Sequence, residues 1–235
     1  VIGGMSREKA GYPLIGYFAS NNAYAAGLKT PKDLAGKRVA VTQVGSSFHY
    51  SLGLLADKYG FKLSDVRVVP LQSLSNAAAA LKGETVDAAL LPASTARPLM
   101  ETNGAKLLGW VGDETPWQLG AVFASPKTLA NKALVTKLLA ALVKADREYH
   151  DVILAAIKDG KAPIDEKTKP LLDIIAKYTN LPVEQVVGNC AYVDPDGKLD
   201  VKNVANQISW LQEQGFVDRG FDADAIIAKE YVKPD

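Results

Sequence analysis

Three consecutive strand–helix units fill most of the first half of the sequence, and they limit the folds open to the chain. In each unit a short run of small and β-branched residues leads into a polar turn and then into apolar residues at helical spacing. The predicted units are strands 38–42, 66–70 and 88–91 with helices 47–59, 73–82 and 94–102, followed by a further strand at 105–111. Such alternation predicts an α/β fold with a parallel sheet and right-handed crossovers.

The first polar turn, Gly45-Ser46-Ser47, carries the clearest functional signal. Gly45 can adopt the backbone angles that the turn needs, and Ser46 or Ser47 can cap the helix that follows. The amides of the first helical turn then point outward at the positive end of the helix dipole, where a carboxylate, sulfonate or phosphate oxygen would satisfy them. The alternative is a serine that only caps the helix. Neither a P-loop nor a dinucleotide-binding fingerprint is present.

The other two turns are polar at the equivalent place, Leu71-Gln72-Ser73 and Pro92-Ala-Ser-Thr95. Ligands of open α/β sheets bind outside the carboxyl ends of the strands, so the strand ends at Val44, Leu71 and Leu91 are predicted to face a common cleft. The candidate ligand-binding residues are Ser46, Ser47, His49, Tyr50, Gln72, Ser73, Pro92, Ser94, Thr95 and Trp117.

Most of these residues also have a purely structural interpretation. Of His49 and Tyr50, one is expected to face the cleft and the other a neighbouring helix. Ser73, like Ser94 or Thr95 in the third turn, could simply cap its helix. Trp117 either stacks on a planar ligand or packs in a hinge. The sequence places no carboxylate beside His49, so no catalytic residue is predicted.

Composition excludes several classes of function. The 235 residues are 48% hydrophobic and 23% charged with a formal net charge of +1, and without a Lys/Arg run neither nucleic acid nor a membrane surface is an expected partner. Cys190 is the single cysteine, and the two histidines, His49 and His150, lie far apart, so no disulfide, metal site or cofactor is predicted. No apolar run approaches the roughly 20 residues of a membrane span.

The order of elements predicts two lobes. Residues 37–111 form an inserted second lobe, and residues 1–36 and 112–235 form the first. Strands at 1–7, 12–20 and 118–125 are assigned to the first lobe, the last two as its crossing strands. Its C-terminal part is predicted to be helical, with helices at 131–158, 166–178, 182–188, 201–214 and 222–230.

Several segments together resemble a known family. They are Asp33-Leu-Ala-Gly-Lys-Arg-Val-Ala-Val before Gly45-Ser-Ser-Phe-His, the helix and Val-Asp-Ala strand of residues 78–91, and Gln207-Ile-Ser-Trp-Leu-Gln-Glu-Gln-Gly. The sequence is similar to periplasmic substrate-binding proteins of ABC importers, of the nitrate/sulfonate/taurine and pyrimidine-precursor type. The resemblance implies the type II periplasmic-binding fold, with two α/β lobes joined by two hinge crossings and a helical C-terminal segment.

The resemblance also implies a function. A protein of this kind is not an enzyme: it binds a small anionic or polar organic molecule, such as a sulfonate, nitrate, a carboxylate or a heterocycle, in the inter-lobe cleft and delivers it to an ABC permease from the periplasm. The alternatives are an enzyme of the same fold, desulfinase-like or pyrimidine-precursor synthase-like, or the effector-sensing domain of a regulator. Such enzymes use a reactive cysteine or a Cys-rich motif, and Cys190 lies far from the three turns in sequence.

Family members begin with a strand–helix–strand–helix portion ahead of the segment that starts here at Val1, and no signal peptide is present in this chain. The first lobe is therefore expected to carry an unpaired sheet edge and uncovered apolar surface near Val1. Such an edge predicts self-association through the incomplete lobe.

Overall fold

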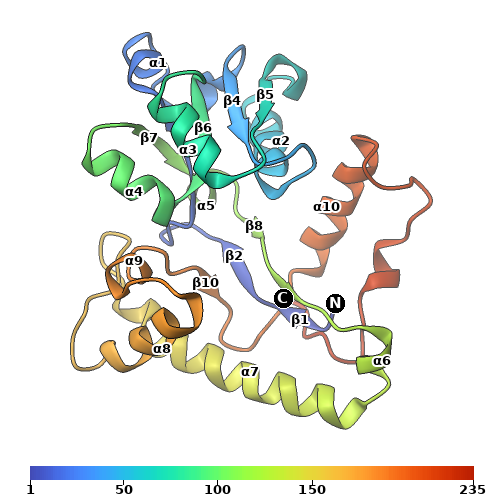
Figure 1. The fold of residues 1–235 in the computed structure, drawn as a ribbon. Helices are drawn as coiled ribbons and strands as arrows, with labels where there is room; N and C mark the ends of the chain where they lie inside the picture. Colours follow the sequence, from blue (N-terminus) through green and yellow to red (C-terminus); the bar gives the residue numbers. More distant parts are fainter. The chain divides into compact units, whose positions relative to one another are not determined.

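The computed structural model describes residues 1–235, which divide into two compact units. Unit 1 contains residues 1–7 and 117–235, and unit 2 contains residues 8–116. None of the helices combines the length and the apolar character that crossing a bilayer requires. Each unit is described separately below (Figure 1).

Unit 2 is built on a five-stranded sheet with the strand order β5-β4-β6-β3-β7. The strands are β3 (Ile15–Ala19), β4 (Arg38–Val41), β5 (Arg67–Pro70), β6 (Ala88–Pro92) and β7 (Lys106–Trp110). Strand β4 pairs in parallel with both β5 and β6, which confirms the parallel arrangement expected for these three strands. Strand β3 runs antiparallel between β6 and β7.

The position of β3 differs from the expectation. Local sequence patterns predict that residues 12–20 belong to the first lobe and that the sheet of the second lobe is wholly parallel. Every residue of β3 is buried, so the strand needs cover on both faces, and the middle of a sheet between helices supplies it. Residues 8–36 consequently belong to the same unit as the three strand–helix pairs, and the division at residues 8 and 116 differs from the one expected at 37 and 111.

Helices cover both faces of this sheet. The long ones are α2 (Ser47–Tyr59), α3 (Leu74–Lys82) and α4 (Ala93–Glu101), and the short ones are α1 (Asn21–Ala25), η1 (Pro31–Leu34), η2 (Leu63–Asp65) and α5 (Val111–Glu114). Neighbouring residues of β3 point to opposite faces. The Tyr17 hydroxyl donates to the Ser51 carbonyl of α2 at 3.0 Å, whereas Phe18 packs in a cluster with Ala77 of α3 and Ala96 of α4. Unit 2 is therefore a three-layer α/β structure.

Unit 1 contains two small sheets. Its strands are β1 (Gly3–Gly4), β2 (Ser6–Glu8), β8 (Trp117–Gln118), β9 (Ala121–Val122) and β10 (Tyr192–Val193), ordered β1-β9 and β10-β2-β8. The final residue of β2, Glu8, begins unit 2. The predicted strand at 118–125 is broken into β8 and β9, and at the break the Gln118 side chain donates to the Gly120 carbonyl at 2.6 Å.

Helices make up the rest of unit 1. They are α6 (Pro126–Leu129), α7 (Lys132–Val152), η3 (Leu154–Ala156), α8 (Lys169–Thr179), α9 (Val183–Val186), α10 (Val201–Glu213) and η4 (Ala223–Ile226). The predicted helix at 222–230 is wrong. Only the short turn η4 forms there, and the Ala228 amide donates to the Val1 carbonyl at 2.9 Å instead of continuing a helix.

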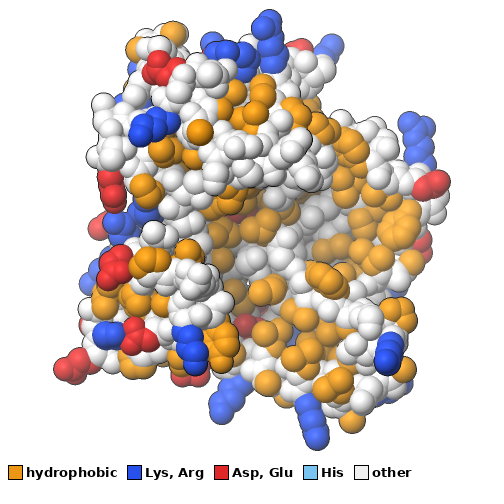
Figure 2. Space-filling model, viewed as in Figure 1, with side chains coloured by type: hydrophobic (Ala, Val, Ile, Leu, Met, Phe, Trp, Pro, Cys, Tyr) orange, Lys and Arg blue, Asp and Glu red, His pale blue; other side chains and the backbone are white.

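The start of the chain is only partly exposed. Ile2 is buried, and the Val1 carbonyl accepts from the Ala228 amide at 2.9 Å. Met5 and Phe123 are exposed, Phe123 to 81%, and Figure 2 shows several groups of hydrophobic side chains on the visible face. The predicted strand at 1–7 is divided between β1 and β2. Self-association through this segment stays a prediction.

Candidate functional site

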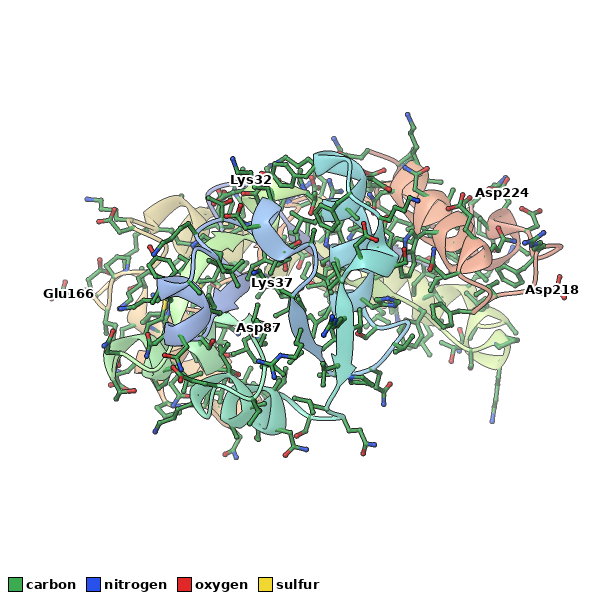
Figure 3. The ribbon with its side chains drawn as sticks, turned by 90° about the horizontal axis from the view of Figure 1, so that it is seen from above. Lys32, Lys37, Asp87, Glu166, Asp218 and Asp224 are labelled. Carbon is green, nitrogen blue, oxygen red and sulfur yellow. The ribbon has the colours of Figure 1, made fainter.

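The three polar turns of unit 2 lie at one edge of the sheet. Strands β4, β5 and β6 are parallel and in register, with Val41 beside Pro70 and Ala40 beside Ala89. Their carboxyl ends therefore meet at the same edge, as the repeated strand–turn–helix pattern predicted. The ion pair between Arg38 and Asp87, 2.8 Å long, lies at the opposite edge, and Figure 3 shows Asp87 there together with Lys37. A hydrogen bond from Arg38 lowers the pKa of Asp87.

The first turn is closed by Ser46. Gly45 has φ +79, a left-handed conformation that suits glycine, and the Ser46 hydroxyl accepts from the His49 amide at 3.4 Å as the N-cap of α2. Ser47 is the first residue of α2 and is exposed. The two serines thus have different roles: Ser46 caps the helix, and the Ser47 hydroxyl is left at the surface.

The buried side chain of His49 is hydrogen-bonded to the first turn. It is 7% exposed, and the Gly45 amide donates to its Nδ1 atom at 3.1 Å. Burial lowers the pKa of His49, so the ring is neutral near pH 7, and because Nδ1 accepts, the proton resides on Nε2. Tyr50 is also buried, at 5% exposure. Both side chains of this pair therefore pack inside unit 2, and His49 positions the turn.

Two backbone donors remain at the start of α2. No backbone carbonyl accepts from the amides of Ser47 and Phe48, the first two residues of this 13-residue helix. Open amides at a helix N-terminus favour an anionic or strongly polar oxygen. The first turn therefore has the donors that the sequence predicted, supplied by the backbone more than by the serine hydroxyls.

The second turn combines a cap with an unusual backbone. Gln72 is exposed and has φ +66, a left-handed conformation rare for residues with a side chain, and its amide donates to the Thr42 carbonyl at 2.7 Å. The Ser73 hydroxyl accepts from the Asn76 amide at 3.1 Å and caps α3. Asn76 in turn donates to the Leu71 carbonyl at 2.9 Å. Ser73 is thus a cap, and the side chain of Gln72 is the polar group that this turn exposes.

The third turn is tighter than predicted. Strand β6 runs directly into α4, Pro92 occupies the N-cap position, and the Ala93 amide donates to the Leu14 carbonyl at 2.8 Å. Helix α4 consequently begins one residue earlier than expected. Ser94 and Thr95 lie in its first turn, half-buried, rather than capping it.

Trp117 and Cys190 lie in unit 1, whereas the three turns lie in unit 2. Trp117 is 5% exposed in β8. The Cys190 thiol is buried and donates to the Val186 carbonyl at 3.4 Å. No group of three or more His, Cys, Asp or Glu side chains is arranged to hold a metal ion.

The structure adds one residue that the sequence did not single out. Glu8 is only 1% exposed, and neither of its carboxyl oxygens has a hydrogen-bond partner. Burial raises the pKa of Glu8 to about 8. The backbone amides of Ile15 and Gly112 lower this pKa, and the negative charge of Asp113 raises it. In the sequence Glu8 stands between Arg7 and Lys9, a charged run typical of a surface, so no signal marked it.

The fold of the chain matches solved structures over nearly its whole length. The periplasmic aliphatic sulphonate-binding protein SsuA of Escherichia coli matches with a TM-score of 0.69 and 19% identity, over 98% of this chain and 74% of that one. The alkanesulfonate-binding SsuA of Xanthomonas axonopodis pv. citri, bound to MOPS, matches with a TM-score of 0.64 and 19% identity, over 100% and 74%. These likenesses show the type II periplasmic-binding fold.

An enzyme shares this fold. The desulfurization enzyme DSZB matches with a TM-score of 0.60 and 15% identity, over 98% of this chain and 77% of the enzyme. A comparison with curated protein sequences finds no match. The family model described as NMT1/THI5 like matches residues 16–151, which include every strand of unit 2 except the first residue of β3 and all three polar turns. The chain therefore belongs to the NMT1/THI5-like family.

Proposed function

We propose that the chain is the solute-binding component of an ABC transporter and that it binds a small anionic or polar organic molecule at the carboxyl edge of the unit 2 sheet. The observation that carries the proposal is the N-terminus of α2, where the Ser47 and Phe48 amides have no backbone acceptor and the Ser47 hydroxyl is exposed. Neutral donors at a helix terminus suit sulfonate, carboxylate and nitrate oxygens.

The comparisons support this function by fold alone. SsuA of Escherichia coli is a periplasmic sulphonate-binding protein, and the Xanthomonas SsuA holds MOPS, itself a sulfonate. A sulfonate presents three oxygens, enough to accept from the α2 amides and the Ser47 hydroxyl together. On this proposal the protein acts in the periplasm and its macromolecular partner is a membrane permease.

A desulfinase-like enzyme is the second candidate, favoured by the fold shared with DSZB. Nucleophilic chemistry would need an accessible thiolate, and burial in apolar surroundings keeps a thiol protonated and inert. Cys190 is buried and donates to a carbonyl in unit 1. This placement leaves Cys190 without a part in such chemistry.

Replacing both serines tests the site. In the Ser46→Ala/Ser47→Ala variant we expect MOPS affinity to fall by roughly 10- to 100-fold, since hydrogen bonds to a charged group contribute about 1.5–3 kcal/mol each. Losing the Ser46 cap should cost only about 1 kcal/mol of folding stability. Isothermal titration calorimetry with MOPS, methanesulfonate, nitrate and acetate measures the first effect, and urea unfolding the second.

Ser125→Ala is the matched control. The Ser125 hydroxyl caps α6 in unit 1 by accepting from the Thr128 amide at 3.2 Å, so this variant loses a cap without touching the turns. Its affinity should equal that of the wild type. Wild-type protein that binds none of these anions would overturn the function, and unchanged affinity in the double variant would show that the Ser47 hydroxyl is not part of the site.

A further inference from the structure

The carboxyl group of Glu8 is buried without a hydrogen-bond partner. It is 1% exposed, and both carboxyl oxygens lack a hydrogen-bond partner. A buried ionised carboxylate without a partner is strongly unfavourable, and the group avoids that state by keeping its proton. The proposed binding function does not use this residue.

The carboxyl lies where the first and last segments of unit 2 meet. A Cβ atom added to Gly112 would lie 2.5 Å from the Lys9 carbonyl oxygen, so the backbones of residues 9 and 112 are in direct contact there. The Gly11 amide donates to the Asp113 carboxylate at 3.0 Å across the same junction. Glu8 directly precedes Lys9, so its buried carboxyl belongs to this junction, and the amides of Ile15 and Gly112 lower its pKa against the effect of burial.

The neighbouring charge that shifts the pKa of Glu8 is negative, that of Asp113. The titratable groups that act on it or on its neighbour Tyr17 are Tyr17 of β3, Asp113 and Glu114 of α5, and Tyr59 of α2. Lys58 of α2 is bound to Glu114 at 2.6 Å. On its own segment, Arg7 is paired with Asp235 at 2.6 Å, and Lys9 is exposed. Burial and acidic neighbours therefore act in the same direction.

We propose that the Glu8 carboxyl is a pH-sensitive latch: the first and last segments of unit 2 stay packed around it while it carries its proton, and they open to solvent as it ionises. Opening of this junction would directly affect the third polar turn. Ile15 follows Leu14, whose carbonyl accepts from the Ala93 amide at the start of α4. Through this hydrogen bond the junction at Glu8 is connected to one of the turns at the carboxyl edge.

Amide hydrogen exchange followed by mass spectrometry tests the latch without any ligand. In the wild type, after correction for the intrinsic exchange rate, protection of peptides covering residues 8–16, 90–97 and 108–116 should fall roughly tenfold per pH unit from pH 5 and level off above about 8. Glu8→Gln keeps the shape but cannot ionise, so its protection should not depend on pH. Peptides from α7 in unit 1 should be unaffected in both proteins.

Asp146→Asn is the matched control, because Asp146 is another carboxyl with a raised pKa, about 6, but lies in unit 1. This variant should keep the wild-type pH profile at the three peptides. A wild-type profile that does not change with pH would overturn the latch, and this result needs no variant to fold. The same pH profile in Glu8→Gln as in the wild type would also overturn it.

Discussion

Ionisation of Glu8 is expected to cost the wild-type protein roughly 4 kcal/mol of its free energy of unfolding between pH 4.5 and pH 8, a loss that the Glu8→Gln variant should not show. Glu8 has a folded-state pKa raised from 4.5 to about 8. The folded state therefore binds more protons than the unfolded state in this range. The stabilising effect of the proton is complete below pH 4.5 and disappears as the pH rises through about 8.

Urea unfolding at a series of pH values measures this effect. Asp146, His49 and the N-terminal amine also have shifted pKa values in this range, so the difference between the wild type and Glu8→Gln isolates the effect of Glu8. Between pH 6 and 8 the wild type should lose about 1 kcal/mol of stability per pH unit relative to Glu8→Gln. Parallel curves for the two proteins would show that Glu8 ionises freely in the folded state.

Replacing Phe18 with alanine should cost about 3–5 kcal/mol of folding stability. Phe18 is fully buried in the centre of β3, and its ring meets Trp110 edge to face at a centroid distance of 5.8 Å. The substitution removes this contact and leaves a cavity between the sheet and helices α3 and α4. Thermal and urea unfolding followed by circular dichroism measure the loss.

Phe123→Ala is the control for this change, because the same side chain is removed from a position that is 81% exposed. Its effect on stability should stay within about 0.5 kcal/mol. A small effect of Phe18→Ala would mean that β3 is not a central strand of the sheet, and the assignment of residues 8–36 to unit 2 would then be wrong.

Local patterns predicted much of unit 2 because its strands and helices have strong local signals. Strands β4, β5 and β6 and helices α2 and α3 begin and end within one or two residues of the expected positions. The place of β3 depends on long-range pairing with β6 and β7, which local periodicity does not contain. The same limit applies to residues 222–230, where the Ala228 amide pairs with the Val1 carbonyl from the other end of the chain.

The candidate site was predictable in its location but only partly in its chemistry. Glycine and serine at the end of a strand locate a turn and a cap, and Ser46 and Ser73 indeed cap α2 and α3. Which side of a helix is buried depends on the neighbouring elements, so the burial of both His49 and Tyr50 could not be read from spacing. The burial of Glu8 arises from the meeting of segments about 100 residues apart in sequence.

The most direct test of the proposed binding function is to map the ligand on the backbone amides. Isotope-labelled protein is titrated with MOPS, and the amide resonances are followed by nuclear magnetic resonance. The account predicts that the largest shifts occur at Ser47 and Phe48, with smaller ones at Gln72 and in the first turn of α4. Saturable binding that shifts amides elsewhere and leaves those of Ser47 and Phe48 unchanged would contradict it.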